Sequence, residues 1–208
     1  MYEIASPRVR QYLEAETQHV LEKLRPEHSV IELGCGYGRI LRHLAERAEW
    51  VTGIDTSISS LILAKRMLGD ISNCSLYQMD ANHLGFRDGI YDIVICIQNG
   101  ISAFQVERVS LIKESMRIAK PRGTVMFSTY SEKFWRCRLQ WFEQQARLGL
   151  LGEIDNDRTA DGVIVCKDGF RSTTVSSLDF QEIRASLKID ARIVEVDESS
   201  LFFEITVP

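Results

Sequence analysis

The sequence predicts an α/β fold in which helices cover both faces of a largely parallel β-sheet. Up to about residue 130, short apolar runs that suit strands alternate with segments whose apolar residues recur at helical spacing, an order typical of parallel sheets. Residues 91–97 are nearly all apolar after their start, as expected for a strand buried on both faces. The 208 residues suffice for one domain with a sizeable core.

The elements follow in order from apolar spacing and from turn residues. The predicted strands are 29–33, 50–55, 74–78, 91–97, 124–129, 189–196 and 200–207. The predicted helices are 8–24, one from about 37 to 45, 57–68, 103–119, 132–150 and 178–187. Ser57 suits the N-cap of its helix. Residues 121–123 break a helix, and Asp197 and Glu198 form a turn.

The alternation changes after residue 130. A helix rich in large side chains is followed by two short strands, 162–166 and 170–175, that flank the turn residues 167–169. We expect residues 131–176 to form a cap of one helix and one hairpin, inserted into a single domain that spans residues 1–208.

Composition excludes several classes of protein. The net charge is −4 and the pI is near 5.6, so no general basic field attracts nucleic acid or an anionic membrane. Five scattered cysteines show no metal-ligand spacing, which predicts neither a metal site nor a disulfide framework. No apolar run reaches the length of a membrane span, and the first residues lack a signal-peptide core. We therefore expect a cytoplasmic protein.

Polar or glycine residues follow four successive predicted strands. They are Gly34, Gly36 and Gly38 after the first strand, Asp55 after the second, Asp80 after the third, and Gln98 with Asn99 after the fourth. Carboxyl ends of parallel strands share one edge, which is where open α/β sheets bind ligands. The glycines let a ligand approach the backbone, and Asp55 is suited to accept hydrogen bonds from ribose hydroxyls.

The run Glu32-Leu33-Gly34-Cys35-Gly36-Tyr37-Gly38 resembles the first motif of class I S-adenosylmethionine (SAM)-dependent methyltransferases. The spacing of the other strand ends resembles that family across about residues 28–130. The resemblance implies a Rossmann-like, seven-stranded sheet of order 3-2-1-4-5-7-6 with the last strand antiparallel. It also implies SAM as cofactor and S-adenosylhomocysteine as product.

The resemblance also implies roles for individual residues. Residues around the glycine turn would line the methionine portion of SAM, with Glu32 holding its ammonium group. Asp55 would take the ribose hydroxyls, and Asp80 the adenine amino group. The full set of expected cofactor contacts is Glu32, Gly34, Cys35, Gly36, Tyr37, Gly38, Asp55, Thr56, Ser57, Asp80, Ala81, Ile97, Gln98 and Asn99.

The same glycine turn could also belong to a nicotinamide-dinucleotide site or to a non-catalytic SAM-binding module. A nicotinamide-dinucleotide fingerprint needs a small residue five positions after the first glycine, whereas Arg39 stands there. A non-catalytic SAM-binding module would keep the same motifs. Residues 98–101 are Gln-Asn-Gly-Ile and lack the Pro-Pro-Tyr pattern of nucleic-acid amino methyltransferases, which disfavours a nucleic-acid acceptor. A protein or RNA acceptor is the alternative to a small molecule.

The cap is the predicted wall of the acceptor site. Its candidate residues are Tyr130, Trp135, Arg138, Trp141, Phe170 and Arg171, although each would equally suit plain packing of the cap on the core. The four histidines show no pattern of a catalytic base, and no catalytic residue is assigned. The activated methyl group of SAM needs mainly an oriented nitrogen or oxygen lone pair. The Trp- and Phe-rich cap leaves a monomer and a homodimer both open.

Overall fold

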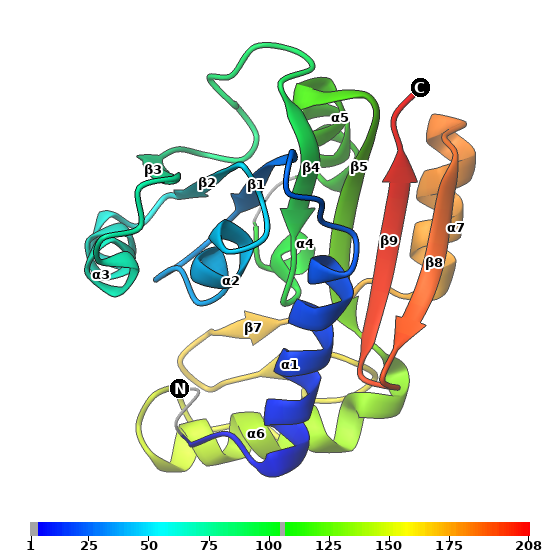
Figure 1. The fold of residues 1–208 in the computed structure, drawn as a ribbon. Coiled ribbons are helices and arrows are strands. Elements are labelled where there is room, and N and C mark those ends of the chain that lie inside the picture. The colour runs from blue at the N-terminus through cyan, green and yellow to red at the C-terminus, as the bar shows by residue number, and fades with distance from the viewer. Residues whose placement is uncertain (1–3, 105–106) are drawn as a thin grey trace.

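The computed structural model describes residues 4–104 and 107–208, and its centre is a seven-stranded sheet (Figure 1). The strands are β1 Ser29–Leu33, β2 Trp50–Asp55, β3 Cys74–Gln78, β4 Tyr91–Cys96, β5 Ala119–Tyr130, β8 Ala191–Val196 and β9 Ser200–Thr206. Their order is β3-β2-β1-β4-β5-β9-β8. Only β9 runs antiparallel to its neighbours, β5 and β8. The predicted order and the antiparallel last strand are confirmed.

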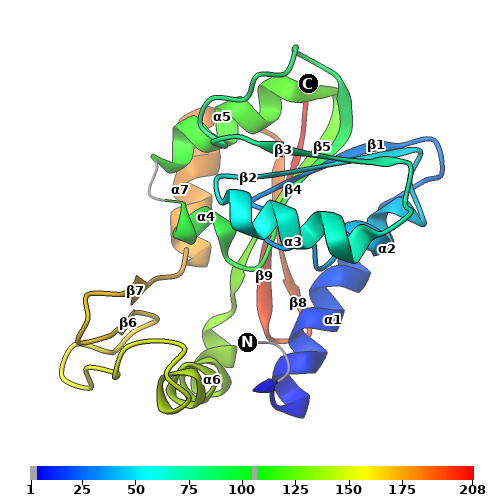
Figure 2. The ribbon, with the colours of Figure 1, turned by 90° about the vertical axis from the view of Figure 1, so that its left-hand side faces the viewer.

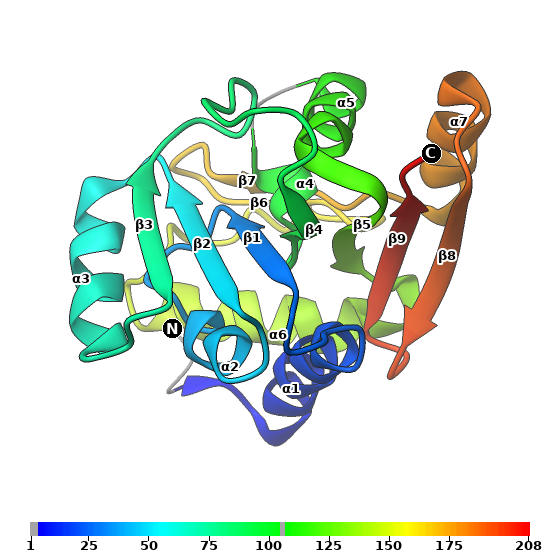
Figure 3. The same ribbon diagram turned by 45° about the horizontal axis from the view of Figure 1, so that its top comes forward.

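Helices cover both faces of the sheet, as predicted (Figure 3). They are α1 Pro7–Leu21, α2 Leu41–Ala45, α3 Ile58–Leu68, α4 Gly100–Ala103, α5 Arg108–Ile118, α6 Trp135–Arg147 and α7 Ser177–Leu187. One buried cluster joins β1, β2 and β4 to Leu41 of α2 and Leu61 of α3. The other joins β4, β5 and β9 to Ile112 of α5 and Phe180 of α7. Burial on both faces explains the nearly continuous apolar run in β4.

Several element ends follow from single polar residues. The Ser57 hydroxyl accepts a hydrogen bond from the Ser60 N–H at 3.2 Å, which confirms the predicted N-cap of α3. Ser176 and Asp179 form a capping box at the start of α7. Asp197 and Glu198 both have positive φ in the turn 197–199 between β8 and β9, and the Ser199 N–H closes that turn on the Val196 carbonyl at 3.0 Å.

Three predicted elements differ from the structure. The helix expected from about residue 37 begins at Leu41, because Gly36 and Gly38 adopt left-handed conformations that an α-helix excludes. The expected helix 103–119 is instead α4 and α5, with residues 105–106 outside the described part of the chain. The expected turn at residues 121–123 lies within β5, where Arg122 has a positive φ and the register with β4 shifts.

The cap differs in detail from its prediction. The expected helix 132–150 starts as a 3₁₀ turn, Glu132–Phe134, and its α-helical part ends at Arg147. The expected hairpin strands shrink to two residues each, β6 Ile164–Val165 and β7 Arg171–Ser172. Figure 2 shows α6 and this hairpin together beyond the carboxyl end of β5.

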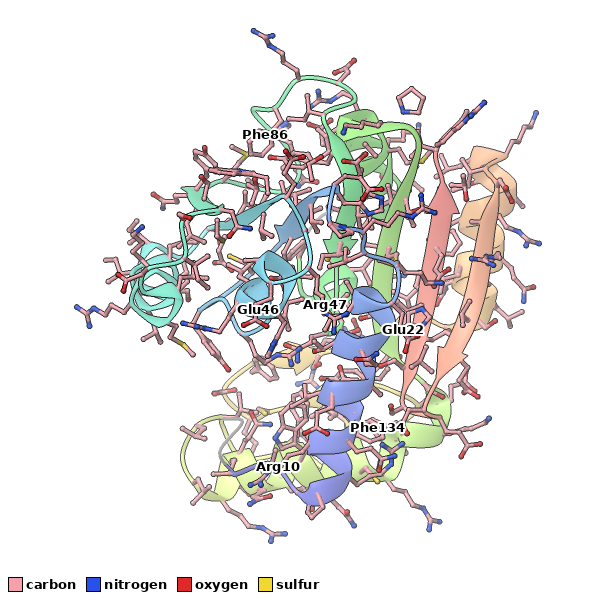
Figure 4. All side chains as sticks on the ribbon, viewed as in Figure 1. Arg10, Glu22, Glu46, Arg47, Phe86 and Phe134 are labelled. Atoms are coloured by element: carbon pink, nitrogen blue, oxygen red, sulfur yellow. The ribbon has the colours of Figure 1, made fainter. Side chains whose placement is uncertain are left out.

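A third buried cluster attaches the cap to α1. Tyr12 of α1 packs against Tyr130 and Phe134, with ring centroids 5.4 and 5.0 Å apart. Figure 4 shows Phe134 beside α1, at the start of the cap. Trp141 and Phe142 of α6 are also buried, so most large aromatic side chains of the cap face inward. Among the described residues, no helix has both the length and the apolar character needed to cross a membrane.

Candidate cofactor and acceptor site

The glycine turn is a compact loop held by its own backbone. Gly34, Gly36 and Gly38 all have positive φ, between 54° and 80°. The Gly38 N–H donates to the Cys35 carbonyl at 2.9 Å, and the Cys35 N–H donates to the Ile54 carbonyl of β2 at 2.8 Å. A Cβ on Gly34 would lie 2.5 Å from the Phe104 ring. The turn therefore keeps its shape only with glycine at these positions.

Asp55 joins the glycine turn to the start of α3. One carboxylate oxygen accepts the Gly36 N–H and the other accepts the Ser57 N–H, each at 2.8 Å. Each oxygen retains a further lone pair, so the fixed carboxylate can still accept hydrogen bonds from a ligand. This anchoring of the turn by the acid was not part of the sequence prediction.

A first cavity, of about 280 Å³, opens at these strand ends. It is lined by Gly34, Asp55, Thr56, Met79, Asp80, Ala81, Ala103 and Phe104. Five of the expected cofactor contacts therefore meet at one cavity. Met79, Ala103 and Phe104 were not predicted as cofactor contacts. Phe104 falls within the helix expected over residues 103–119, where an apolar side chain suits the core as well as a ligand site.

Glu32 of β1 lies buried beneath the glycine turn. Its side-chain oxygen Oε2 has no hydrogen-bond partner among the described residues. Burial raises the pKa of this carboxyl to about 8, against the effect of Arg39, which lowers it. A buried carboxylate oxygen without a partner is costly. A cationic group of a ligand placed beside it would relieve that cost.

A second cavity, of about 230 Å³, lies beside Gln98 and Asn99. Its lining is Tyr12, Gln98, Asn99, Ala103, Tyr130, Trp141, Phe142, Gln145, Leu151, Phe170 and Ser172. Ala103 lines both cavities, so the two lie next to each other. The lining is aromatic and amide-rich, and no Asp, Glu, Lys or Arg belongs to it within the described part of the chain.

Comparison with known proteins agrees with this geometry. Residues 30–123 match the family model described as a methyltransferase domain. The chain is similar to a ubiquinone biosynthesis O-methyltransferase of Nitrosomonas europaea, 33% identical over 109 residues, which cover 50% of this chain and 44% of that relative. It is 28% identical over 114 residues to a 2-methyl-6-phytyl-1,4-hydroquinone methyltransferase of Synechocystis. The match covers 54% of this chain and 35% of that relative.

A solved SAM-dependent methyltransferase of Aquifex aeolicus shares the fold. Its TM-score is 0.68 at 16% identity, over 100% of this chain and 96% of that chain. The chain carries a class I SAM-dependent methyltransferase domain. SAM is the cofactor of such a domain and S-adenosylhomocysteine its product. The chain spans about half the length of the curated relatives it matches.

The residues of the methyltransferase domain fit SAM where the two can be compared. SAM carries an ammonium group, which suits the buried Glu32 oxygen, and ribose hydroxyls, which suit Asp55. Some expected contacts are arranged otherwise. The Cys35 side chain is buried and turned toward Gly53, and Ile97 is buried in the core. Neither these two residues nor Glu32, Gly36, Tyr37, Gly38 and Ser57 line the described cavities.

Gln98 and Asn99 line the second cavity together with Ala103. Both have positive φ, which is costly for residues other than glycine. The Asn99 amide donates to the Thr173 carbonyl and accepts from the Thr129 hydroxyl, both at 2.8 Å. Asn99 was expected among the cofactor contacts, but it lines the second cavity and not the first. Its amide, however, ties β4 and β5 to the cap.

The expected acceptor residues divide between two cavities. Tyr130, Trp141 and Phe170 line the second cavity. Trp135 and Arg138 line a third cavity, of about 410 Å³, on which Tyr130 also borders. Arg171 is exposed on β7 and belongs to the lining of neither. Three of the six predicted acceptor residues therefore meet at the second cavity.

Arg138 is buried, and its contacts lie within the cap. Its guanidinium donates to the Gly162 carbonyl at 2.7 Å and to the Ser172 hydroxyl at 2.8 Å. It also lies 4.4 Å from the centre of the Tyr130 ring. Burial lowers its pKa. These contacts assign Arg138 to holding α6 against the hairpin.

Proposed function

We propose that the protein transfers the methyl group of SAM to an oxygen or nitrogen atom of a small, uncharged, aromatic acceptor. The observation that carries this proposal is the second cavity, which adjoins the cofactor cavity at Ala103 and has an aromatic lining without charged side chains. Aromatic walls favour flat apolar ligands. Two relatives are named for ubiquinone biosynthesis and for a hydroquinone acceptor, and a hydroquinone is such a molecule.

The residues of this chain would act mainly by binding and orientation. Bound SAM supplies a methyl group already activated on a sulfonium. Asp55 and Glu32 would hold the cofactor at its ribose and ammonium groups, with Gly34 and Phe104 beside it. Tyr130, Trp141 and Phe170 would exclude water and hold the acceptor ring. Orientation of this kind supplies up to roughly 7–11 kcal/mol in favourable cases.

Calorimetric titration tests the cofactor part of the proposal. We expect Asp55→Ala to weaken SAM binding about 10²-fold or more, because it removes a charged hydrogen-bond acceptor and loosens the turn. Asp70→Ala, in the exposed turn that follows α3, is the matched control and should bind as the native protein does. Unchanged affinity in Asp55→Ala would refute the assignment, and binding of NAD in place of SAM would favour an oxidoreductase.

Turnover tests the acceptor part. The native protein is incubated with SAM and either catechol, a short peptide mixture or total RNA, and methylated products are measured by mass spectrometry. We expect methylated catechol. Transfer to peptide or RNA alone would favour the alternative acceptors. SAM binding without transfer to any acceptor would favour a non-catalytic module.

A further inference from the structure

Helix α1 places a buried carboxyl group behind the acceptor cavity. Glu16 is wholly buried, at 0% exposure. One of its oxygens accepts hydrogen bonds from the Ser128 hydroxyl of β5 at 2.6 Å and from the Ser200 hydroxyl of β9 at 2.9 Å. Buried carboxylates without a charged hydrogen-bonding partner are rare because they are costly. The cofactor assignment gives Glu16 no task.

Tyr12 connects Glu16 to the acceptor cavity. It lines that cavity together with Gln98 and Asn99. Because it precedes Glu16 by four residues on α1, the two side chains lie on the same face of the helix, one turn apart. A phenol hydroxyl both donates and accepts, so it can pass on a proton. The cavity wall therefore contains one group able to relay a proton, and the carboxyl group lies behind it.

The Ser128 hydroxyl connects the same carboxyl to the backbone at the methyl-transfer end. It accepts the Gln98 N–H at 2.9 Å while donating to Glu16. Gln98 has a positive φ and lines the acceptor cavity. The position of Glu16 is thus fixed relative to the point at which cofactor and acceptor would meet.

We propose that Tyr12 and Glu16 form a proton-accepting pair for the methyl acceptor, an aromatic hydroxyl compound. An oxygen lone pair of the acceptor forms the bond to the methyl carbon, and the carbon–sulfur bond breaks with its electrons left on sulfur. The acceptor hydroxyl proton passes to the Tyr12 oxygen as the Tyr12 proton passes to the Glu16 carboxylate. Tyr12 is the catalytic residue and Glu16 acts through it. The pair rests on the proposed function and adds the base that the sequence did not reveal.

The surroundings of Glu16 give its carboxylate a higher affinity for a proton than an exposed glutamate has. Burial raises its pKa, while Ser128, Ser200, Arg39 and Tyr12 lower it in that order. Arg39 also donates to the Thr17 hydroxyl of α1, at 3.2 Å. Burial, Glu32 and Glu16, in that order, raise the pKa of the Cys96 thiol of β4.

Difference infrared spectroscopy tests the pair without any acceptor. Spectra of the native protein and of Glu16→Gln, both bound to S-adenosylhomocysteine, are subtracted over a pH series. We expect a protonated carboxyl band that persists at about pH 6, where an ordinary glutamate has lost its proton, and that disappears at alkaline pH. A carboxyl already ionised at pH 6, or still protonated at pH 10, would overturn the proposal.

Kinetics with catechol supply the second test. We expect Glu16→Gln and Tyr12→Phe to lower kcat about 10²–10⁴-fold, with little change in KM or in SAM affinity. In the native protein kcat should rise with increasing pH, as the carboxyl group loses its proton. This rise should be lost in Glu16→Gln and partly restored in Glu16→Asp. Glu14→Gln, on the exposed face of the same helix, is the control for changes of charge on α1. Unchanged kcat with an unchanged pH profile would overturn the pair.

The failures of the two proposals can be told apart. If the native protein binds SAM but does not methylate catechol, the aromatic-acceptor part of the proposed function fails, and the infrared series still decides whether Glu16 titrates as a proton acceptor should. If both variants lose SAM binding or lower the melting temperature together with kcat, Glu16 serves structure alone and the pair is refuted.

Discussion

At the scale of single residues, the site depends on groups that destabilise the folded protein without ligand and that a bound ligand would stabilise. Glu32 is the plainest case, because its unpartnered oxygen is buried under the glycine turn. The folded state keeps a proton on this carboxyl up to a pKa of about 8, whereas the unfolded chain loses it near the ordinary 4.5. Burial makes the folded protein less stable as pH rises between these values.

The prediction concerns the pH dependence of stability. For the protein without ligand, we expect the free energy of unfolding to fall by up to a few kcal/mol between about pH 5 and pH 8. In Glu32→Gln this decline should be much shallower, since glutamine does not titrate. Urea denaturation followed across the pH range measures it. Glu27→Gln, an exposed residue before β1, should retain the native slope, and an equally steep decline in Glu32→Gln would contradict the assignment.

At the scale of elements, the cap depends on one buried cation. Arg138 extends from α6 to the hairpin segment, and no acidic side chain among the described residues pairs with it. Carbonyl and hydroxyl acceptors and the Tyr130 ring surround its charge instead. Since the hairpin strands have only two residues each, their own ladder is too short to hold the cap. The guanidinium supplies the missing connection.

We therefore expect Arg138→Met to loosen the cap without disturbing the cofactor cavity. The free energy of unfolding should fall by about 3 kcal/mol, because buried acceptors lose a charged donor. Hydrogen exchange should accelerate over residues 160–175, and methyl transfer should decline while SAM affinity is kept. Hydrogen-exchange mass spectrometry and calorimetry measure these effects. Arg171→Met, at an exposed site on β7, should change none of them; equal protection of the cap in Arg138→Met would contradict the prediction.

The sequence predicts the cofactor side of the molecule better than the acceptor side. Gly34, Asp55 and Asp80 stand next to their strands, so local order alone brings them to one edge. Contacts such as that between Glu16 and Ser128, 112 residues apart, have no local signal. The same holds for Phe104 against Gly34 and for Arg138 against Gly162. A buried arginine and a solvated one look alike in sequence, because the packing that distinguishes them is tertiary.

At the scale of the whole molecule, α1 determines whether the acceptor cavity exists. The helix contributes Tyr12 to that cavity, and polar contacts hold it across the sheet. Arg8 pairs with Asp197 at 2.6 Å, and Glu16 accepts hydrogen bonds from β5 and β9. The third anchor is Glu204 of β9, which lies 2.6 Å from His19 of α1 and 3.4 Å from Lys23, just after that helix.

Glu204 makes the attachment of α1 sensitive to acid. His19 above all, then Lys23 and Arg192, lower the pKa of this carboxyl from 4.5 to about 2, in spite of burial. The stabilisation is fully present above about pH 4.5 and is lost as pH falls toward 2. We expect Glu204→Gln to lower the free energy of unfolding at pH 7 by about 3 kcal/mol, and the melting temperature by about 6–12 °C. The stability difference between the variant and the native protein should vanish near pH 2.

Thermal unfolding between pH 2 and pH 7 measures the stability difference between Glu204→Gln and the native protein. Hydrogen exchange shows whether α1 opens before the rest of the fold. Glu153→Gln breaks an exposed pair with Lys167 and should shift stability by less than about 1 kcal/mol. Because α1 also carries Tyr12 and Glu16, acceptor turnover in Glu204→Gln should decline at temperatures below those at which SAM binding is lost. If binding and turnover decline together, the sheet and α1 unfold as one unit, and the acceptor cavity has no separate dependence on this helix.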